Sequence, residues 1–157
     1  MANADTARGL IPVGHRNGAP YMGQARVYYV PSTYGTALYL GDPLIIVTDA
    51  SDAVGIPTVS IASAAGGAYT IGPMVGIANG GVWDTNYNVG ITRDLNLYHP
   101  ASTAGYVLVA DDPDLLFEIQ EDGDAGAMGV GAVGRNVDFI SGTGSTTTGY
   151  SGWMADS

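Results

Sequence analysis

Residues 106–124 read YVLVADDPDLLFEIQEDGD, and this stretch decides the fold class. Two apolar runs, residues 106–110 and 115–120, flank the turn DDPD at 111–114. Proline has a fixed φ and no backbone donor, and neighbouring aspartates can hydrogen-bond the local backbone, so a turn is favoured there. In the second run apolar and polar residues alternate from Phe117 onward, which is the period of a strand with one buried face. The stretch predicts a strand, a turn and a second strand, with an acidic outer face.

The same pattern repeats along the chain from residue 25. Gly, Pro, Asn or Asp separates short apolar runs at spacings typical of a β-sandwich or a barrel. No segment keeps apolar residues at helical spacing beyond one turn. The sequence therefore predicts a compact all-β sandwich or barrel. The predicted strands are residues 26–30, 37–40, 44–48, 58–62, 69–71, 74–77, 89–92, 106–110, 115–120 and 136–140.

Residues 1–23 differ from the rest of the chain because they are polar, hold four glycines and two prolines, and show no period. We expect them to form an extended N-terminal arm, with residues 24–157 as a single all-β domain. A length of 157 residues fits one such domain. Residues 141–152 are rich in Gly, Ser and Thr and predict a loop. Trp153 and Met154 follow this loop, and we expect them to pack against the body or a neighbour.

The charge balance excludes several partners. The chain has fifteen acidic residues, five arginines and no lysine, for a net charge of −10. Such a chain repels phosphate backbones and anionic lipid surfaces, so we expect no nucleic-acid or membrane partner. Hydrophobic residues make up 46% and charged residues only 13%, against about a quarter in a typical soluble domain. This composition indicates that part of the surface faces another protein.

Arginine and tyrosine gather near the N-terminus. Three of the five arginines lie in the first twenty-six residues, and the chain has ten tyrosines against two phenylalanines. Both residue types are enriched at protein interfaces, so an arm that docks on an acidic partner is one interpretation. The alternatives are that these arginines are simply solvated and that strands favour tyrosine. The candidate residues for an interface with another protein or another copy are Arg8, Arg16, Tyr21, Arg26, Tyr28 and Tyr29.

No motif predicts catalysis or a cofactor. The glycines at 129, 131 and 134 have dinucleotide-binding spacing, but no strand is predicted before them and no helix after them. The acids between 111 and 124 lack the spacing of a calcium loop, and a solvated acidic face explains them better. His15 and His99 do not neighbour a nucleophile motif. We therefore expect no enzyme activity, no metal and no cofactor, although a hydrolase that uses an acidic pair stays an alternative.

The chain contains no cysteine, which excludes disulfides and thiolate metal sites. It also contains no apolar run of eighteen residues, and its first twenty residues do not have the form of a signal peptide. Production in the cytoplasm is the expectation that follows.

Short motifs are spread over most of the chain, and together they resemble a family of tailed-bacteriophage head proteins. The resemblance implies a capsid cement or decoration protein with a jelly-roll-like or β-tulip-like fold, made in the bacterial host cytoplasm. Its partners would be the major capsid protein on the outer surface of the expanded virion head and its own copies, in a homodimer or homotrimer. Longer relatives continue past the position of Ser157 with further strands. The motifs are MANAD at 1–5, GLIPV at 9–13, NGAPY at 17–21, YYVPS at 28–32, GDP at 41–43, GIPTV at 55–59, PASTA at 100–104, the stretch 106–124 and GTGST at 142–146.

A second role on the virion fits the same composition. A displayed carbohydrate-binding β-sandwich would help attachment to a host surface, and it would need exposed tyrosines or Trp83 and Trp153 on a concave face.

Overall fold

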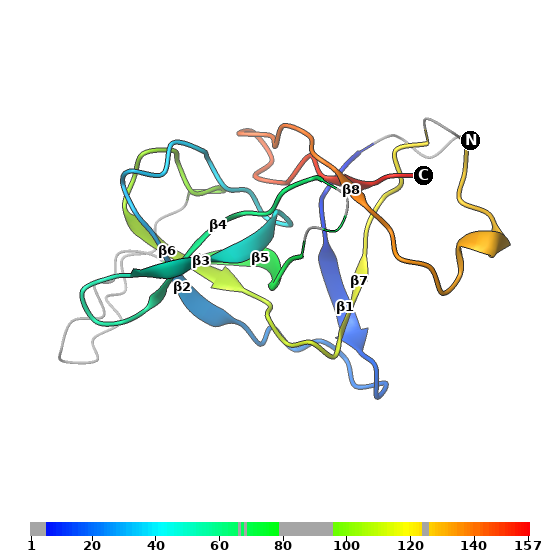
Figure 1. The fold of residues 1–157 in the computed structure, drawn as a ribbon, viewed down its shortest axis with the longest axis horizontal. Helices are drawn as coiled ribbons and strands as arrows, with labels where there is room; N and C mark the ends of the chain where they lie inside the picture. The colour runs from blue at the N-terminus through cyan, green and yellow to red at the C-terminus, as the bar shows by residue number, and fades with distance from the viewer. Residues whose placement is uncertain (1–5, 66, 68, 79–95, 124–125) are drawn as a thin grey trace.

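The computed structural model describes residues 6–65, 67, 69–78, 96–123 and 126–157. Regular structure in these residues is almost entirely β, which confirms the all-β prediction (Figure 1). The helical element among them is a single 3₁₀ turn, η1 (Val130–Ala132). The strands are β1 (Ile11–His15), β2 (Arg26–Val30), β3 (Pro43–Ser51), β4 (Pro57–Ile61), β5 (Gly72–Ala78), β6 (Gly105–Val109), β7 (Leu115–Glu118), β8 (Phe139–Ile140) and β9 (Met154–Ala155).

Five of these strands close into a barrel in the order β2-β4-β3-β5-β6. Strand β2 pairs with β6 along its whole length in antiparallel register and with β4 in parallel. The other pairs of the barrel are antiparallel. Closure gives each strand of the barrel a partner on both sides.

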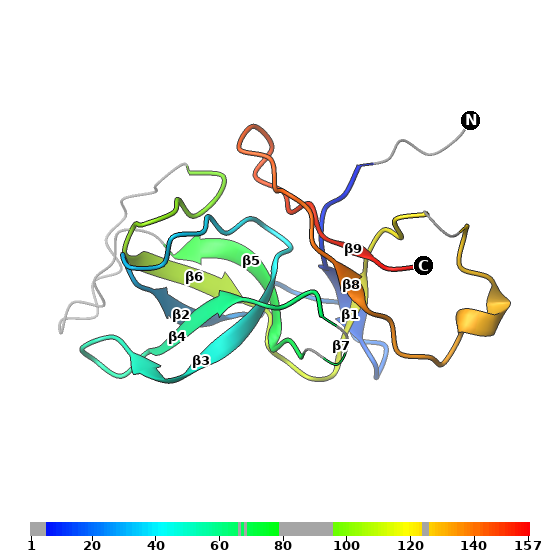
Figure 2. The same cartoon turned by 45° about the horizontal axis from the view of Figure 1, so that its top comes forward.

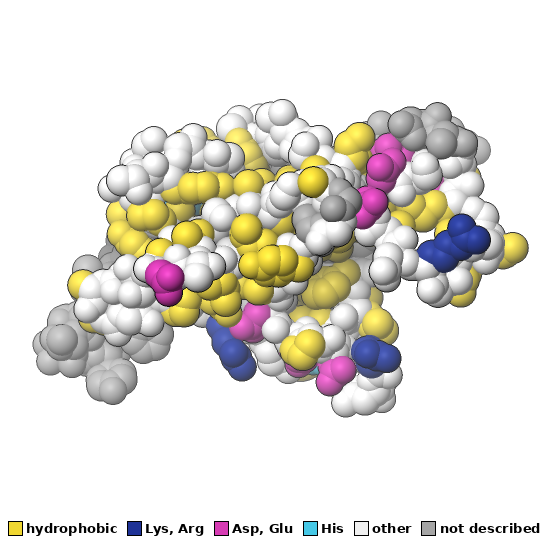
Figure 3. All heavy atoms as spheres, in the orientation of Figure 1, with side chains coloured by type: hydrophobic (Ala, Val, Ile, Leu, Met, Phe, Trp, Pro, Cys, Tyr) yellow, Lys and Arg dark blue, Asp and Glu magenta, His cyan; other side chains and the backbone are white. Residues whose placement is uncertain are grey.

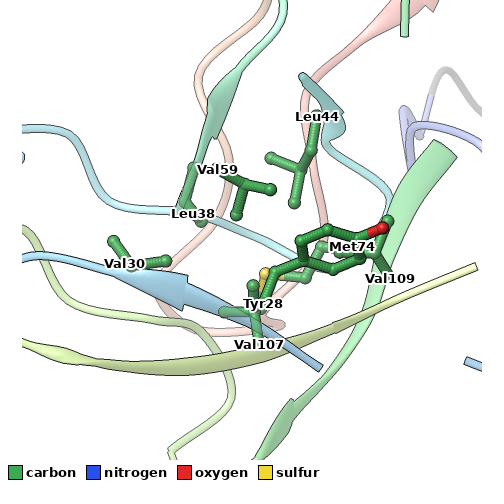
Figure 4. Close-up of a cluster of buried hydrophobic side chains, with 8 residues drawn as sticks. All are labelled: Tyr28, Val30, Leu38, Leu44, Val59, Met74, Val107 and Val109. Carbon is green, nitrogen blue, oxygen red and sulfur yellow. The ribbon is translucent and has the colours of Figure 1, made fainter. Parts of the chain in front are cut away.

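The barrel core follows from alternation along its strands. In β2 the side chains of Tyr28 and Val30 point inward, and in β6 those of Val107 and Val109 do so. Tyr28 pairs with Val107, so the two strands contribute to one layer of the core. Figure 4 shows these side chains converging with those of the other strands. The buried cluster consists of Tyr28, Val30, Leu38, Leu44, Val59, Met74, Val107 and Val109.

Two small sheets lie outside the barrel (Figure 2). Strands β1 and β7 form an antiparallel two-stranded ribbon whose register shifts between Pro12 and Gly14. Strands β8 and β9 form the other, and a bridge between Glu121 and Ala155 joins β9 to the chain just after β7. The two strands of the stretch 106–124 therefore belong to different sheets, β6 to the barrel and β7 to the ribbon.

Several expectations need correction. Residues 37–40 form no strand, because Leu38 and Leu40 make only isolated bridges, to His99 and Tyr150. Residues 69–71 are irregular, and the expected strand at 136–140 shortens to β8. The expected strand at 89–92 lies outside the described residues. Within the expected arm, Leu10 is buried and β1 is paired with β7, so this part of the arm is built into the body.

The turn around Gly41 ties the N-terminal segment and the C-terminal tail to the barrel. The amide of Leu10 donates to the carbonyl of Gly41 over 2.9 Å, and the amide of Gly41 donates to Met74 of β5 over 2.8 Å. From the tail, the amide of Ser151 donates to Leu40 over 2.9 Å. Three segments that are distant in sequence therefore meet at one turn.

Asp42 is the buried acid of this turn, with 1% of its surface exposed. Its Oδ2 accepts a hydrogen bond from the Tyr39 amide over 2.8 Å. Burial raises the pKa of Asp42 to about 6 from 3.8, although hydrogen bonds from the Ser151 side chain and the Tyr39 backbone oppose the shift. The carboxyl group is therefore easier to hold in the fold as a neutral acid than as an anion.

We expect the wild-type protein to lose stability as the pH rises from 4 to 6. The Asp42→Asn variant is expected not to show this loss. In this window the folded state holds the proton of Asp42 more tightly than the unfolded state does, so stability falls as the pH rises through it. The shift corresponds to roughly 2–3 kcal/mol. Urea unfolding of both proteins from pH 4 to pH 8 measures it, with the exposed Asp156→Asn variant as the control. A wild-type minus Asp42→Asn difference that stays constant over this range would contradict the assignment.

Candidate interface site

The acidic turn at residues 111–114 is held by side chains from the N-terminal part of the chain. The hydroxyl of Tyr28 donates to Oδ2 of Asp111 over 2.8 Å. The Nη1 atom of Arg26 lies 3.5 Å from the same oxygen. The guanidinium of Arg26 remains largely in solvent, so this ion pair adds little to stability.

The end of β1 contacts the same turn. The Nδ1 atom of His15 lies 3.5 Å from Oδ2 of Asp112. The amide of Arg16 donates to the carbonyl of Asp114 over 2.8 Å, which extends the β1–β7 pairing by one residue. Within the turn, Oδ1 of Asp112 accepts a hydrogen bond from the Asp114 amide over 2.9 Å. The acidic groups that meet Arg26 and His15 thus come from the chain itself.

Two of the predicted tyrosines belong to the barrel. Tyr28 is 6% exposed, and burial followed by the hydrogen bond and charge of Asp111 raises its pKa to about 12. Its ring is therefore a core side chain and leaves the set of surface candidates. Tyr29 is half-buried, and its ring lies 5.4 Å from that of Tyr106 between centroids. The hydroxyl of Tyr106 donates to Oδ2 of Asp52 over 2.8 Å, which attaches the β3–β4 turn to β6.

Arg8 and Tyr21 lie at other places on the surface. The guanidinium carbon of Arg8 lies 5.7 Å from the centroid of the Tyr150 ring, a cation–π contact between the N-terminal segment and the tail. The hydroxyl of Tyr21 donates to the carbonyl of Gln24 over 3.0 Å and so closes a local loop. The structure therefore gathers Arg16, Arg26 and Tyr28 around the acidic turn and leaves Arg8 and Tyr21 in separate contacts.

The sequence interpretation missed two apolar residues on the β1–β7 ribbon. Val13 is 51% exposed and Leu116 is 48% exposed. For Leu116 a signal was present, because the alternation that directs Phe117 inward directs Leu116 and Glu118 outward. For Val13 there was none, since Pro12 and Gly14 obscure the strand period.

The described residues include the glycine motif and both histidines. The glycines at 129, 131 and 134 lie around η1, which is too short to present a helix N-terminus to a pyrophosphate. Among the described residues no group of three His, Asp or Glu side chains could hold a metal ion. His99 is buried, and burial lowers its pKa below the ordinary value. No helix in the described part of the chain is long and apolar enough to cross a membrane.

Trp153 packs against the body of the protein, which is one of the two arrangements expected from the sequence. It is 3% exposed, and its ring meets Phe139 edge-on with 6.4 Å between centroids. A buried ring cannot serve as a sugar-stacking platform, and Trp83 lies outside the described residues.

A scan against protein-family models and searches of curated proteins and of solved structures give no match for this chain.

Proposed function

We propose that this protein is a structural, non-enzymatic component of a bacteriophage virion: a cement or decoration protein on the outer surface of the expanded head. The observation that carries the proposal is the set of motifs that resemble those of phage head proteins, which runs from MANAD at 1–5 to GTGST at 142–146. An all-β barrel with a low charged fraction and a ribbon outside the barrel is compatible with this role.

The proposed mechanism is mass action. A protein that binds the assembled shell, and not its separated subunits, stabilises the shell by its binding free energy. Each site needs to contribute only a few kcal/mol when many sites act on one container. The binding site would form when expansion brings capsid subunits into register, which would give the correct timing.

The proposed partner surface lies outside the barrel. Each barrel strand has a partner on both sides, whereas β1 and β7 form a ribbon of only two strands. β1 is bridged to Pro20 at Gly14, so the outer edge of β7 is the one proposed for β-augmentation by a capsid segment. Arg16 follows β1 directly and is exposed next to it. In this arrangement the interface residues would be those of the ribbon and its flanking turns.

Co-sedimentation with purified phage heads tests the proposal. We expect saturable binding of the protein to expanded, undecorated heads and no binding to unexpanded procapsids. The saturation value gives the copy number and hence the symmetry axis that is occupied. Heads of an unrelated phage serve as the control for nonspecific adsorption. Absence of binding to both expanded heads and procapsids would overturn the proposal.

A further inference from the structure

The outer face of the β1–β7 ribbon carries an apolar pair that the fold does not use. Leu116 is the register partner of Gly14, and Val13 is the residue next to Gly14 at which the register shifts. Both side chains are about half exposed, whereas Leu115 on the other side of β7 is buried. Val13 and Leu116 are therefore exposed apolar side chains on the two strands of the ribbon, beside Gly14 and the Ala19 carbonyl that lies close to it.

Two opposite charges lie together at one end of the ribbon, next to this apolar pair. Arg16 follows β1 and Asp114 precedes β7, and the hydrogen bond between their backbones places the two residues side by side. Both are exposed. Within the described residues the ion pairs at this end of the molecule join His15 to Asp112 and Arg26 to Asp111, and none joins Arg16 or Asp114 to a partner. Figure 3 shows acidic, basic and apolar side chains next to one another along the lower edge of the molecule.

We propose that this face is the surface through which two copies of the chain associate, related by a two-fold axis. A two-fold interface uses the same patch twice and must be self-complementary. The two-fold axis lies in the interface and runs along the ribbon between β1 and β7. Rotation about it brings Arg16 of one copy to Asp114 of the other, and the reverse pair forms at the same time. The result is an apolar centre with a charged rim, the usual anatomy of a protein interface.

Charge favours a second copy at this end of the molecule. Each copy has a net charge of −10, so most of the surface repels another copy. Three of the five arginines lie in the first twenty-six residues, and two of them, Arg16 and Arg26, lie beside the acidic turn 111–114. Positive and negative groups are thus interleaved here, which is the condition for attraction between identical surfaces.

This inference goes beyond the proposed function, which concerns binding to heads, and it takes up the partnership between copies that the resemblance implies. It adds the surface, the symmetry and the residues that pair. Sedimentation of the protein alone therefore tests it separately from head binding.

The experiment reverses the two charges singly and then combines the chains. In Arg16→Asp homodimers two aspartates face each other at both rim positions, and in Asp114→Arg homodimers two arginines do so. We expect each single variant to have a dimer dissociation constant at least about 100-fold above that of the wild type in sedimentation velocity. An equimolar mixture of the two variants restores both opposite-charge pairs between copies, and we expect it to dimerise within about threefold of the wild type.

Two further variants test whether the apolar centre contributes to dimerisation, as distinct from any exposed apolar side chain. Leu116→Ser is expected to weaken the dimer by at least about tenfold, whereas Val54→Ser, at an exposed valine of the β3–β4 turn, is expected to leave it unchanged. Thermal unfolding checks that all variants fold, as expected for exposed side chains. A wild-type protein that stays monomeric at 100 µM would overturn the inference, because this concentration is on the order of the dissociation constant of the weakest useful dimer. So would a mixture of Arg16→Asp and Asp114→Arg that stays as monomeric as each variant alone.

Discussion

Replacement of Gly72 by alanine is expected to destabilise the protein by more than about 4 kcal/mol, which is a large part of the stability of an ordinary domain. Gly72 begins β5 with a φ of +145°, a conformation that side chains rarely adopt. An added Cβ would lie directly against the carbonyl oxygen of Ala110. That carbonyl cannot withdraw easily, because the amide of Ala110 donates to Pro73 over 3.1 Å. Both strain and steric overlap therefore act at the junction of β5 and β6.

Gly76→Ala is the matched control in the same strand. A Cβ at position 76 would approach only the end of a flexible side chain, with 3.2 Å to Cδ1 of Leu108. We expect a change below about 1 kcal/mol for this variant. Urea unfolding of Gly72→Ala, Gly76→Ala and the wild type gives the comparison. Equal stability of the two variants would show that the approach of Ala110 to Gly72 does not restrict the fold.

Truncation of Trp153 to alanine is expected to cost about 3–5 kcal/mol, as for other large buried aromatic side chains. The ring is almost fully buried and packs edge-on against Phe139 of β8. Beside it, the amide of Ala155 donates to the carbonyl of Gln120 over 2.8 Å. Loss of the ring should therefore detach the short β8–β9 sheet from the segment after β7.

Two measurements resolve this effect. Urea unfolding gives the loss of stability, and limited proteolysis reports whether the tail after residue 141 becomes accessible. Trp153→Phe keeps a ring in the same place and is expected to lose roughly half as much stability or less. An alanine variant within about 1 kcal/mol of the wild type and with an unchanged cleavage pattern would mean that the tail contributes little to the fold.

Strand periods could be predicted from the sequence where each strand has its own clear alternation. The prediction for 26–30 coincides with β2, β6 begins one residue before the predicted run 106–110, and β7 lies within the predicted run 115–120. β1 could not be predicted, because Pro12 and Gly14 interrupt its pattern and its partner β7 lies far along the chain. The Asp-Pro dipeptide occurs at two turns with different environments. Asp42 is buried under the tail, whereas Asp112 is exposed, and local sequence does not distinguish them.

The positions of the predicted interface residues in the fold could not be read from the sequence. Arginines and tyrosines near the N-terminus indicated an interface, yet Arg26 and Tyr28 contact Asp111 of the same chain. This contact depends on the pairing of β2 with β6, and such long-range pairing leaves no mark in local spacing. The apolar pair of the ribbon depends in the same way on the pairing of β1 with β7.

The large separation in sequence between paired strands has a consequence for folding kinetics. Arg26 at the start of β2 pairs with Val109 at the end of β6, and Ile11 of β1 pairs with Glu118 of β7. During synthesis the first two strands therefore wait for their antiparallel partners until most of the chain exists, and the tail reaches Leu40 later still. Pairing over such separations carries a large loop-closure entropy before contacts compensate for it. We expect folding on the order of milliseconds to seconds, with the N-terminal strands exposed to other chains until the barrel closes.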